Sequence, residues 1–264
     1  MLKHRVANYL MLTIRLCILN VIATMGYRAN FISKIMLMAL NSTVQMFAWT
    51  IFFTRFTTLS SWTMQDQLLM ISVIWMASCL QQFFAAGVMR LNYYIMSGRL
   101  DYYLTMPRNV LWHIAVEKPD IAEIGTIFVA LSALLWSGYG NLFFLYIGCV
   151  VLCSMIFFGF HLFLQTLTFY AGEMASSAGI LIWMLYDTAY YPQKVFKGLT
   201  AIIFKTLVPA YFLGAVPVAI IAHRHYDQIV WLILIAVFFF IGSILFFNQG
   251  LKRYESGGLM GTRV

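Results

Sequence analysis

The sequence predicts an all-α integral membrane protein with six transmembrane helices. Hydrophobic residues occupy 62% of the 264 positions and charged residues only 10%, whereas soluble domains are about 45–50% apolar. The apolar runs are long and lack the two-residue alternation of barrel strands, so helices are favoured. We expect one transmembrane domain, residues 1–264, surrounded by membrane lipid.

The first element, residues 1–28, is expected to lie at the membrane surface. His4, Asn8 and Arg15 share one stripe at 3.6 residues per turn, which is typical of an amphipathic interfacial helix. Arg15 interrupts what would be the apolar centre of a signal peptide, and no small-residue cleavage pattern follows. We therefore expect the segment to be retained.

Two apolar runs come next, residues 30–53 and residues 67–88. Each exceeds the roughly 20 residues that a helix needs to cross the hydrocarbon core. These runs are the expected first and second crossings.

A polar island interrupts the apolar chain between Arg90 and Glu123. It is the only long polar stretch inside the sequence, so we expect residues 89–120 to form a cytosolic loop. Within the loop, Gly98 and Pro107 bound a segment of the right length for a short surface helix. The loop is the place where a water-soluble partner can bind.

A hairpin and one further crossing are expected after the island. Residues 121–136 form a short apolar run, and the glycine-containing turn at residues 137–141 joins it to the run at residues 142–170. A break at Gly172-Glu173 precedes the fifth run, residues 175–190. The third and fourth crossings are therefore expected to be antiparallel neighbours.

The segment 191–222 is apolar but broken by Pro192, Pro209 and Pro217. Proline removes a helical hydrogen bond, so a pair of re-entrant half-helices is favoured over a straight seventh crossing. Such segments are tolerated at membrane depth where protein or a wet cavity covers them. The sixth crossing then covers residues 229–247.

Positive charge supports six crossings with both termini in the cytosol. This topology places five of the 17 lysines and arginines outside and twelve inside. A seventh crossing would move Lys252 and Arg253 outside. The five outer residues are Arg55, Lys194, Lys197, Lys205 and Arg224; the twelve inner ones are Lys3, Arg5, Arg15, Arg28, Lys34, Arg90, Arg99, Arg108, Lys118, Lys252, Arg253 and Arg263.

Neither a catalytic constellation nor a metal site is expected. Phe204 precedes Lys205-Thr206, where a phosphate-binding loop requires glycine, so any ATP that drives the protein is hydrolysed by another subunit. The cysteines fall in apolar runs without ligand spacing, so they are interpreted as packing residues, and no cofactor is expected. The net charge of +8 lies at the ends of apolar runs, which indicates topology and not nucleic-acid binding.

Ionisable side chains at membrane depth are the candidate substrate contacts, because burying them is costly. Asp187 lies near Trp183 and Tyr186 at the outer end of the fifth crossing, where it could attract a cationic solute. The alternative is an interfacial carboxylate that is hydrated or paired with Lys194. His161 lies in the middle of the fourth crossing, where a hydrogen bond to a neighbouring helix is the simpler role.

Four strings, in order, carry a resemblance to one family. SGRLDYYLTMP at Ser97–Pro107 resembles the G-x-L-D-x-x-L-x-x-P pattern in the cytosolic loop of bacterial ATP-binding-cassette permeases of the second exporter type (ABC-2). Tyr27-Arg28 with Phe31 is similar to that family's entry into the first crossing. Tyr191-Pro192 and the later prolines are similar to its broken outer segment, and LKRYESGG at Leu251–Gly258 to its ending.

The resemblance implies a permease subunit in the bacterial cytoplasmic membrane. Its cytosolic loop would dock on an ATPase dimer that binds Mg-ATP, and a second related permease would complete a heterodimer, or a second copy a homodimer. One departure is Met106 before Pro107, where a basic residue is expected. The coupling helix would carry Gly98, Arg99, Leu100, Asp101 and Leu104.

Two other functions stay open at this point. A stand-alone secondary transporter or channel would use buried charges or inverted repeats, of which only His161 near a midplane is evident. A membrane-embedded enzyme would need clustered catalytic side chains at one interface, which the sequence does not provide. The exporter subunit, not itself an enzyme, is the preferred interpretation.

Overall fold

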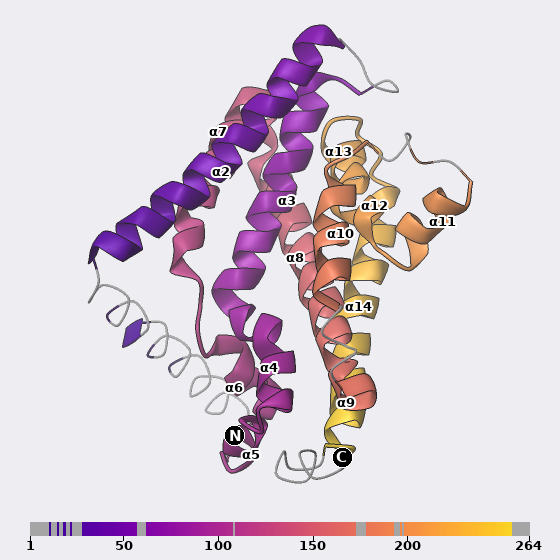
Figure 1. Cartoon of the computed structure of the whole chain (residues 1–264). Helices are drawn as coiled ribbons and strands as arrows, with labels where there is room; N and C mark the ends of the chain where they lie inside the picture. Colours follow the sequence, from indigo (N-terminus) through magenta and orange to yellow (C-terminus); the bar gives the residue numbers. More distant parts are fainter. Residues whose placement is uncertain are drawn as a thin grey trace.

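The computed structural model describes residues 28–56, 62–107, 109–172, 178–192, 196 and 198–254, with isolated positions before residue 28. These ranges form an elongated bundle of helices and contain no β-strand (Figure 1). The expected surface helix at residues 1–28 falls almost entirely outside them, as do Glu173, Arg108, Lys194 and Lys197. The all-α fold is confirmed.

Four helices in the described ranges are long and apolar enough to cross a membrane. At about 1.5 Å per residue, even the shortest of their helical cores exceeds the hydrocarbon thickness of about 30 Å. Each lies within a few residues of a predicted crossing. They are built on α2 (Arg28–Arg55), α3 (Met64–Ala85), α8 (Phe143–Thr166) and α14 (Gln228–Leu251).

The helices found at the other two predicted crossings are too short to span the hydrocarbon core by themselves. The third contains η2 (Ile121–Glu123) and the 14-residue α7 (Ile124–Ser137), about 21 Å long. It reaches the length of a span only together with α6 (Val110–Val116), from which it is bent by 51°. The fifth, α10 (Ala178–Ala189), has 12 residues and is about 18 Å long. The described residues therefore hold four spans, or five with the bent pair, and six are not found.

The proline-broken segment contains three short helices, of which α12 lies beside α10, α13 beside α14, and α11 further out beyond α12 (Figure 1). They are α11 (Leu199–Thr206), α12 (Ala210–Leu213) and α13 (Ala215–Ile221). Pro209 directly precedes α12 and Pro217 lies in the first turn of α13, where a missing N–H costs little. All three prolines of the segment, including Pro192, are buried.

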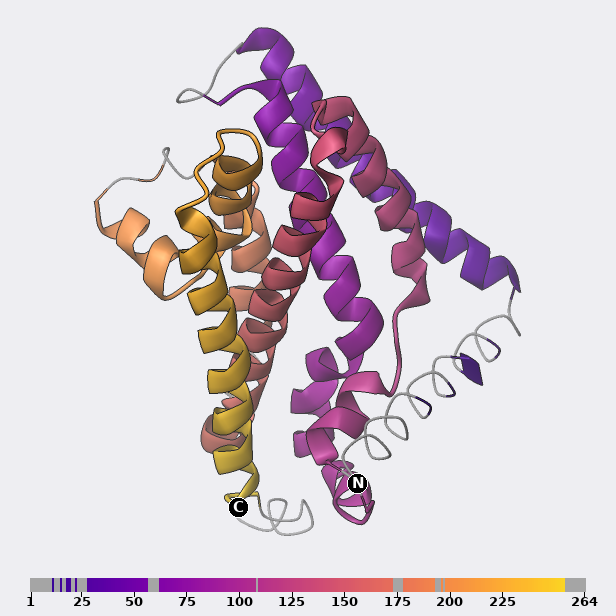
Figure 2. The ribbon, with the colours of Figure 1, turned by 180° about the vertical axis from the view of Figure 1, so that it is seen from behind.

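α3 lies at the centre of the bundle, with α2 and α7 on one side and α8 on the other (Figures 1 and 2). Most of its length is buried. α8 and α14 lie side by side, and their contact requires glycine at position 159, because a Cβ there would lie 2.4 Å from the carbonyl oxygen of Phe239. Ser72 ties α3 to both neighbours: its hydroxyl donates to the Ala130 carbonyl at 2.8 Å and lies 2.8 Å from the Tyr146 hydroxyl.

The island forms a cap of short helices at one end of the bundle, the lower end in Figure 1. After α3 come η1 (Ala86–Arg90), α4 (Leu91–Met96), α5 (Leu100–Leu104) and α6. The turn between α7 and α8, which includes η3 (Gly140–Leu142), lies at the opposite end.

Candidate functional site

α5 is a short helix within the segment that the sequence singles out. It follows Gly98, whose φ of 69° is in the left-handed region that glycine adopts without strain. The helix spans Leu100–Leu104 and is therefore shorter than the predicted segment from Ser97 to Pro107. Asp101 opens its first turn, where a carboxylate is favoured by the helix dipole.

α5 has an inner and an outer face. Leu100 and Tyr103 point into the protein, whereas Arg99, Tyr102 and Leu104 are exposed. The Leu104 side chain is 44% exposed, so the outer face of α5 carries apolar area as well as the Arg99 cation. A face of this composition suits a protein partner.

The inner face of α5 shares a hydrophobic cluster with two long helices. Leu100 and Tyr103 pack in one core with Leu162 of α8 and Phe247 of α14. One apolar core thus joins α5 to both long helices. The cluster also includes Leu91, Tyr94, Ile95, Leu111 and Ile114.

Comparison with known proteins decides the family. Residues 39–258 match the model of the family described as ABC-2 family transporter protein. The chain belongs to the ABC-2 transporter family. No curated protein and no solved structure matches this ABC-2 protein. The family and the long apolar helices together identify it as a multi-pass membrane protein of transport.

The candidate substrate residues of the ABC-2 protein divide between two faces of α10. Trp183, 70% exposed, and Asp187 lie on the outward face, whereas Tyr186 faces the bundle. The Tyr186 ring centroid lies 6.3 Å from that of Trp183 and 6.0 Å from that of His161. Aromatic contacts thus connect Trp183, Tyr186 and His161, and Asp187 lies outside this group.

His161 is completely buried in α8. Within the described part of the chain neither ring nitrogen has a hydrogen-bond partner, so the expected bond to a neighbouring helix is not formed. The ring instead packs against Phe157 and Tyr186. His161 is therefore an aromatic packing residue in this structure.

Two carboxylates that were not among the predicted site residues are buried in the structure. Glu123, expected at the end of a solvated island, is only 8% exposed, and the Cys79 thiol lies 3.2 Å from its Oε2. Asp66 is 2% exposed at the start of α3. No group of three or more metal-binding side chains occurs among the described residues.

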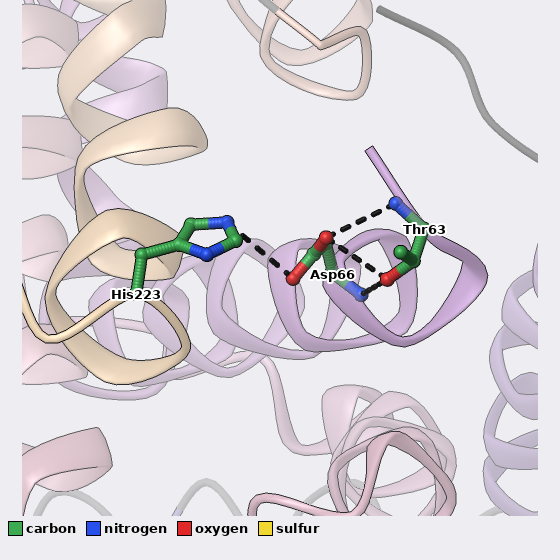
Figure 3. A network of polar contacts seen from close by, with 3 residues as sticks. All are labelled: Thr63, Asp66 and His223. Atoms are coloured by element: carbon green, nitrogen blue, oxygen red, sulfur yellow. Dashed lines mark hydrogen bonds and ion pairs between the residues drawn. The ribbon is translucent and has the colours of Figure 1, made fainter. Parts of the chain in front are cut away.

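Asp66 is the centre of a polar network at the upper end of the bundle (Figure 3). Its Oδ2 accepts from the Thr63 backbone N–H at 3.0 Å, and its own N–H donates to the Thr63 hydroxyl at 3.3 Å, which makes a capping box. Its Oδ1 lies 3.7 Å from Nε2 of His223, which follows α13. Burial, and then the Asp66 charge, raises the pKa of Tyr139 in the turn between α7 and α8.

Proposed function

We propose that this chain is the permease subunit of an ATP-binding-cassette exporter that moves a solute outward with ATP hydrolysed by a separate ATPase dimer. The match to the ABC-2 family over residues 39–258 carries the proposal. The chain supplies the membrane helices and the coupling surface, and the Mg-ATP site belongs to the partner. A second permease, a related chain or a second copy, completes the complex in the bacterial cytoplasmic membrane with both termini cytosolic.

The island supports this assignment by its shape. A water-soluble partner can bind only where the chain leaves the bilayer, and α5 offers there an exposed cation and an exposed leucine over a buried inner face. The proposed coupling residues are Gly98, Arg99, Leu100, Asp101 and Leu104. Leu100 would transmit movement of the ATPase to the bundle, because its side chain is fully buried. Arg99 and Leu104 would contact the ATPase, because their side chains are exposed.

The outward face of α10 supports a role in the solute path. A carboxylate at Asp187 between apolar neighbours such as Trp183 is costly against lipid, so this face is better covered by the second permease or by solute. Closure of the ATPase dimer would push α5 and rock the permease halves, opening a path between them. Tyr186 and His161 would support this wall from inside.

Affinity purification of the tagged chain in mild detergent, followed by mass spectrometry, tests the proposal. The expected result is recovery of an ATPase and a second permease chain in stoichiometric amounts. A crosslinked sample from intact membranes controls for dissociation in detergent. Recovery of this chain alone from both samples would support a stand-alone secondary transporter instead.

A further inference from the structure

The short helices of the island are joined by a partly buried polar contact that the family match does not assign. Glu117 follows α6, and its carboxylate accepts a hydrogen bond from the Tyr94 hydroxyl of α4. The Tyr94 and Tyr103 rings meet edge to face with centroids 5.5 Å apart. Residues of α4, α5 and the end of α6 therefore meet at one point.

Tyr103 belongs to the same arrangement. Burial, and then hydrogen bonding to the Glu117 carboxylate, raises the pKa of the Tyr103 phenol. The phenol is neutral at physiological pH, as an ordinary tyrosine is, and keeps its proton to donate. Hydrogen bonds to a charged acceptor are roughly twice as strong as neutral ones.

The surroundings of this contact are rigid and attached to the long helices. η1 touches α6 so closely that a Cβ at Gly87 would lie 1.6 Å from the Ile114 carbonyl oxygen. The Asn92 N–H of α4 donates to Oε1 of Gln165 in α8 at 3.2 Å. α5 has five residues and no side-chain hydrogen bond at its N-cap, and Leu100 and Tyr103 pack its inner face against these elements.

We propose that Glu117 is a positioning residue that braces α5 against α4 and α6, so that force applied to α5 reaches α8 and α14. Without the brace, α5 could tilt on its apolar contacts and absorb the movement of a partner. With the brace, a displacement of α5 carries Tyr103, Tyr94 and the Leu162–Phe247 cluster with it. This role of Glu117 rests on the proposed coupling to an ATPase, in which Glu117 would keep α5 from moving independently of α4 and α6.

Hydrogen exchange of the complete complex, in lipid nanodiscs with the ATPase that copurifies, tests the brace. Exchange is compared without nucleotide and with Mg-ATP and vanadate, at α5 and at the inner ends of α8 and α14. In the wild type we expect the nucleotide to change exchange at all three places. In Glu117→Ala the change at α5 should persist, while the change at α8 and α14 falls about tenfold, the effect of losing one charge-assisted hydrogen bond.

Conservative variants separate positioning from folding. Tyr94→Phe keeps the ring and loses the donor, so it should reproduce the loss at α8 and α14. Glu117→Gln keeps an acceptor oxygen and should restore most of the response. Tyr93→Phe is the matched control, because Tyr93 is adjacent, 51% exposed and, among the described contacts, stacks its ring under Arg99 at 5.2 Å.

The outcomes distinguish this inference from the function on which it rests. A wild-type response at α8 and α14 in Tyr94→Phe and Glu117→Ala overturns the brace but leaves the exporter proposal intact. Loss of the response in Tyr93→Phe as well would also overturn it, since any change in α4 would then suffice. A wild-type chain that binds no ATPase overturns both.

Discussion

Replacing Asp66 by alanine removes one carboxylate with two separate structural contacts. One oxygen closes the capping box at the start of α3, and the other faces His223 after α13 (Figure 3). We expect Asp66→Ala to destabilise the end of the bundle at which α3 begins. The two contacts differ in strength, so the contribution of each to the loss of stability can be measured separately.

The reciprocal hydrogen bond of the capping box accounts for most of the expected loss. Asp66→Ala keeps the backbone N–H that donates to the Thr63 hydroxyl but removes the carboxylate that accepts from the Thr63 N–H, and a hydrogen bond to a charged group contributes about 1.5 kcal/mol. The contact with His223 adds about 0.5 kcal/mol at most, because that side chain is 48% exposed and the 3.7 Å contact is an ion pair only when the imidazole is protonated. The total of about 2 kcal/mol corresponds to a fall in melting temperature of about 4–8 °C for a chain of this size.

Apparent melting temperatures in one mild detergent, followed by tryptophan fluorescence, provide the assay. Thr63→Ala should lose most of the cap, and His223→Ala should lower the melting temperature by less than about 2 °C. Asp66→Asn keeps an acceptor oxygen and should fall between the wild type and Asp66→Ala. The reasoning fails if His223→Ala is as destabilising as Asp66→Ala, or if Thr63→Ala has no effect.

Three further predictions concern packing, docking and thiol access. Gly159→Ala forces α8 away from Phe239 and should lower the free energy of unfolding by about 1–3 kcal/mol. Gly148→Ala on the same helix places its Cβ in open space and should not destabilise the protein. Equal effects of the two variants on thermal unfolding would contradict the close contact at Gly159. In affinity purification, Leu104→Arg should reduce recovery of the ATPase at least about tenfold. Asn141→Arg, at the opposite end of the bundle, should leave recovery unchanged. Unchanged recovery with Leu104→Arg would argue against docking at α5. Peptide mapping after maleimide treatment should find three buried thiols unlabelled until detergent denaturation, and early labelling would contradict their burial. These are Cys79, Cys149 and Cys153.

The positions of the long helices were predictable because an apolar run longer than a bilayer crossing leaves little choice of secondary structure. α14 was expected at residues 229–247 and spans Gln228–Leu251. The short elements were harder. Hydropathy does not report where helices begin: Asp120 caps η2, and the bend beside Pro119 divides α6 from α7.

The side-chain environment of the candidate site was only partly predictable. The island was expected to be solvated, yet Leu91, Leu100 and Ile114 within it are completely buried. The charged residues make the segment polar in composition, but the apolar residues between them pack against the bundle. The Thr63-x-x-Asp66 capping signal was readable in the sequence. The approach of His223, 157 residues further along the chain, was not, since it depends on the packing of α13 against α3.

The central position of α3 has a consequence for how the protein is made. Its partners α7 and α8 come later in the sequence, and at about 5–20 residues per second the ribosome needs roughly 3–12 s to pass from Ala85 to Phe143. During that time the Ser72 hydroxyl lacks the Ala130 and Tyr146 groups that it meets in the finished protein. α3 is also less apolar than α8 or α14. Among the described spans, the one most enclosed by protein therefore enters the bilayer before α7 and α8, two of the helices that will enclose it.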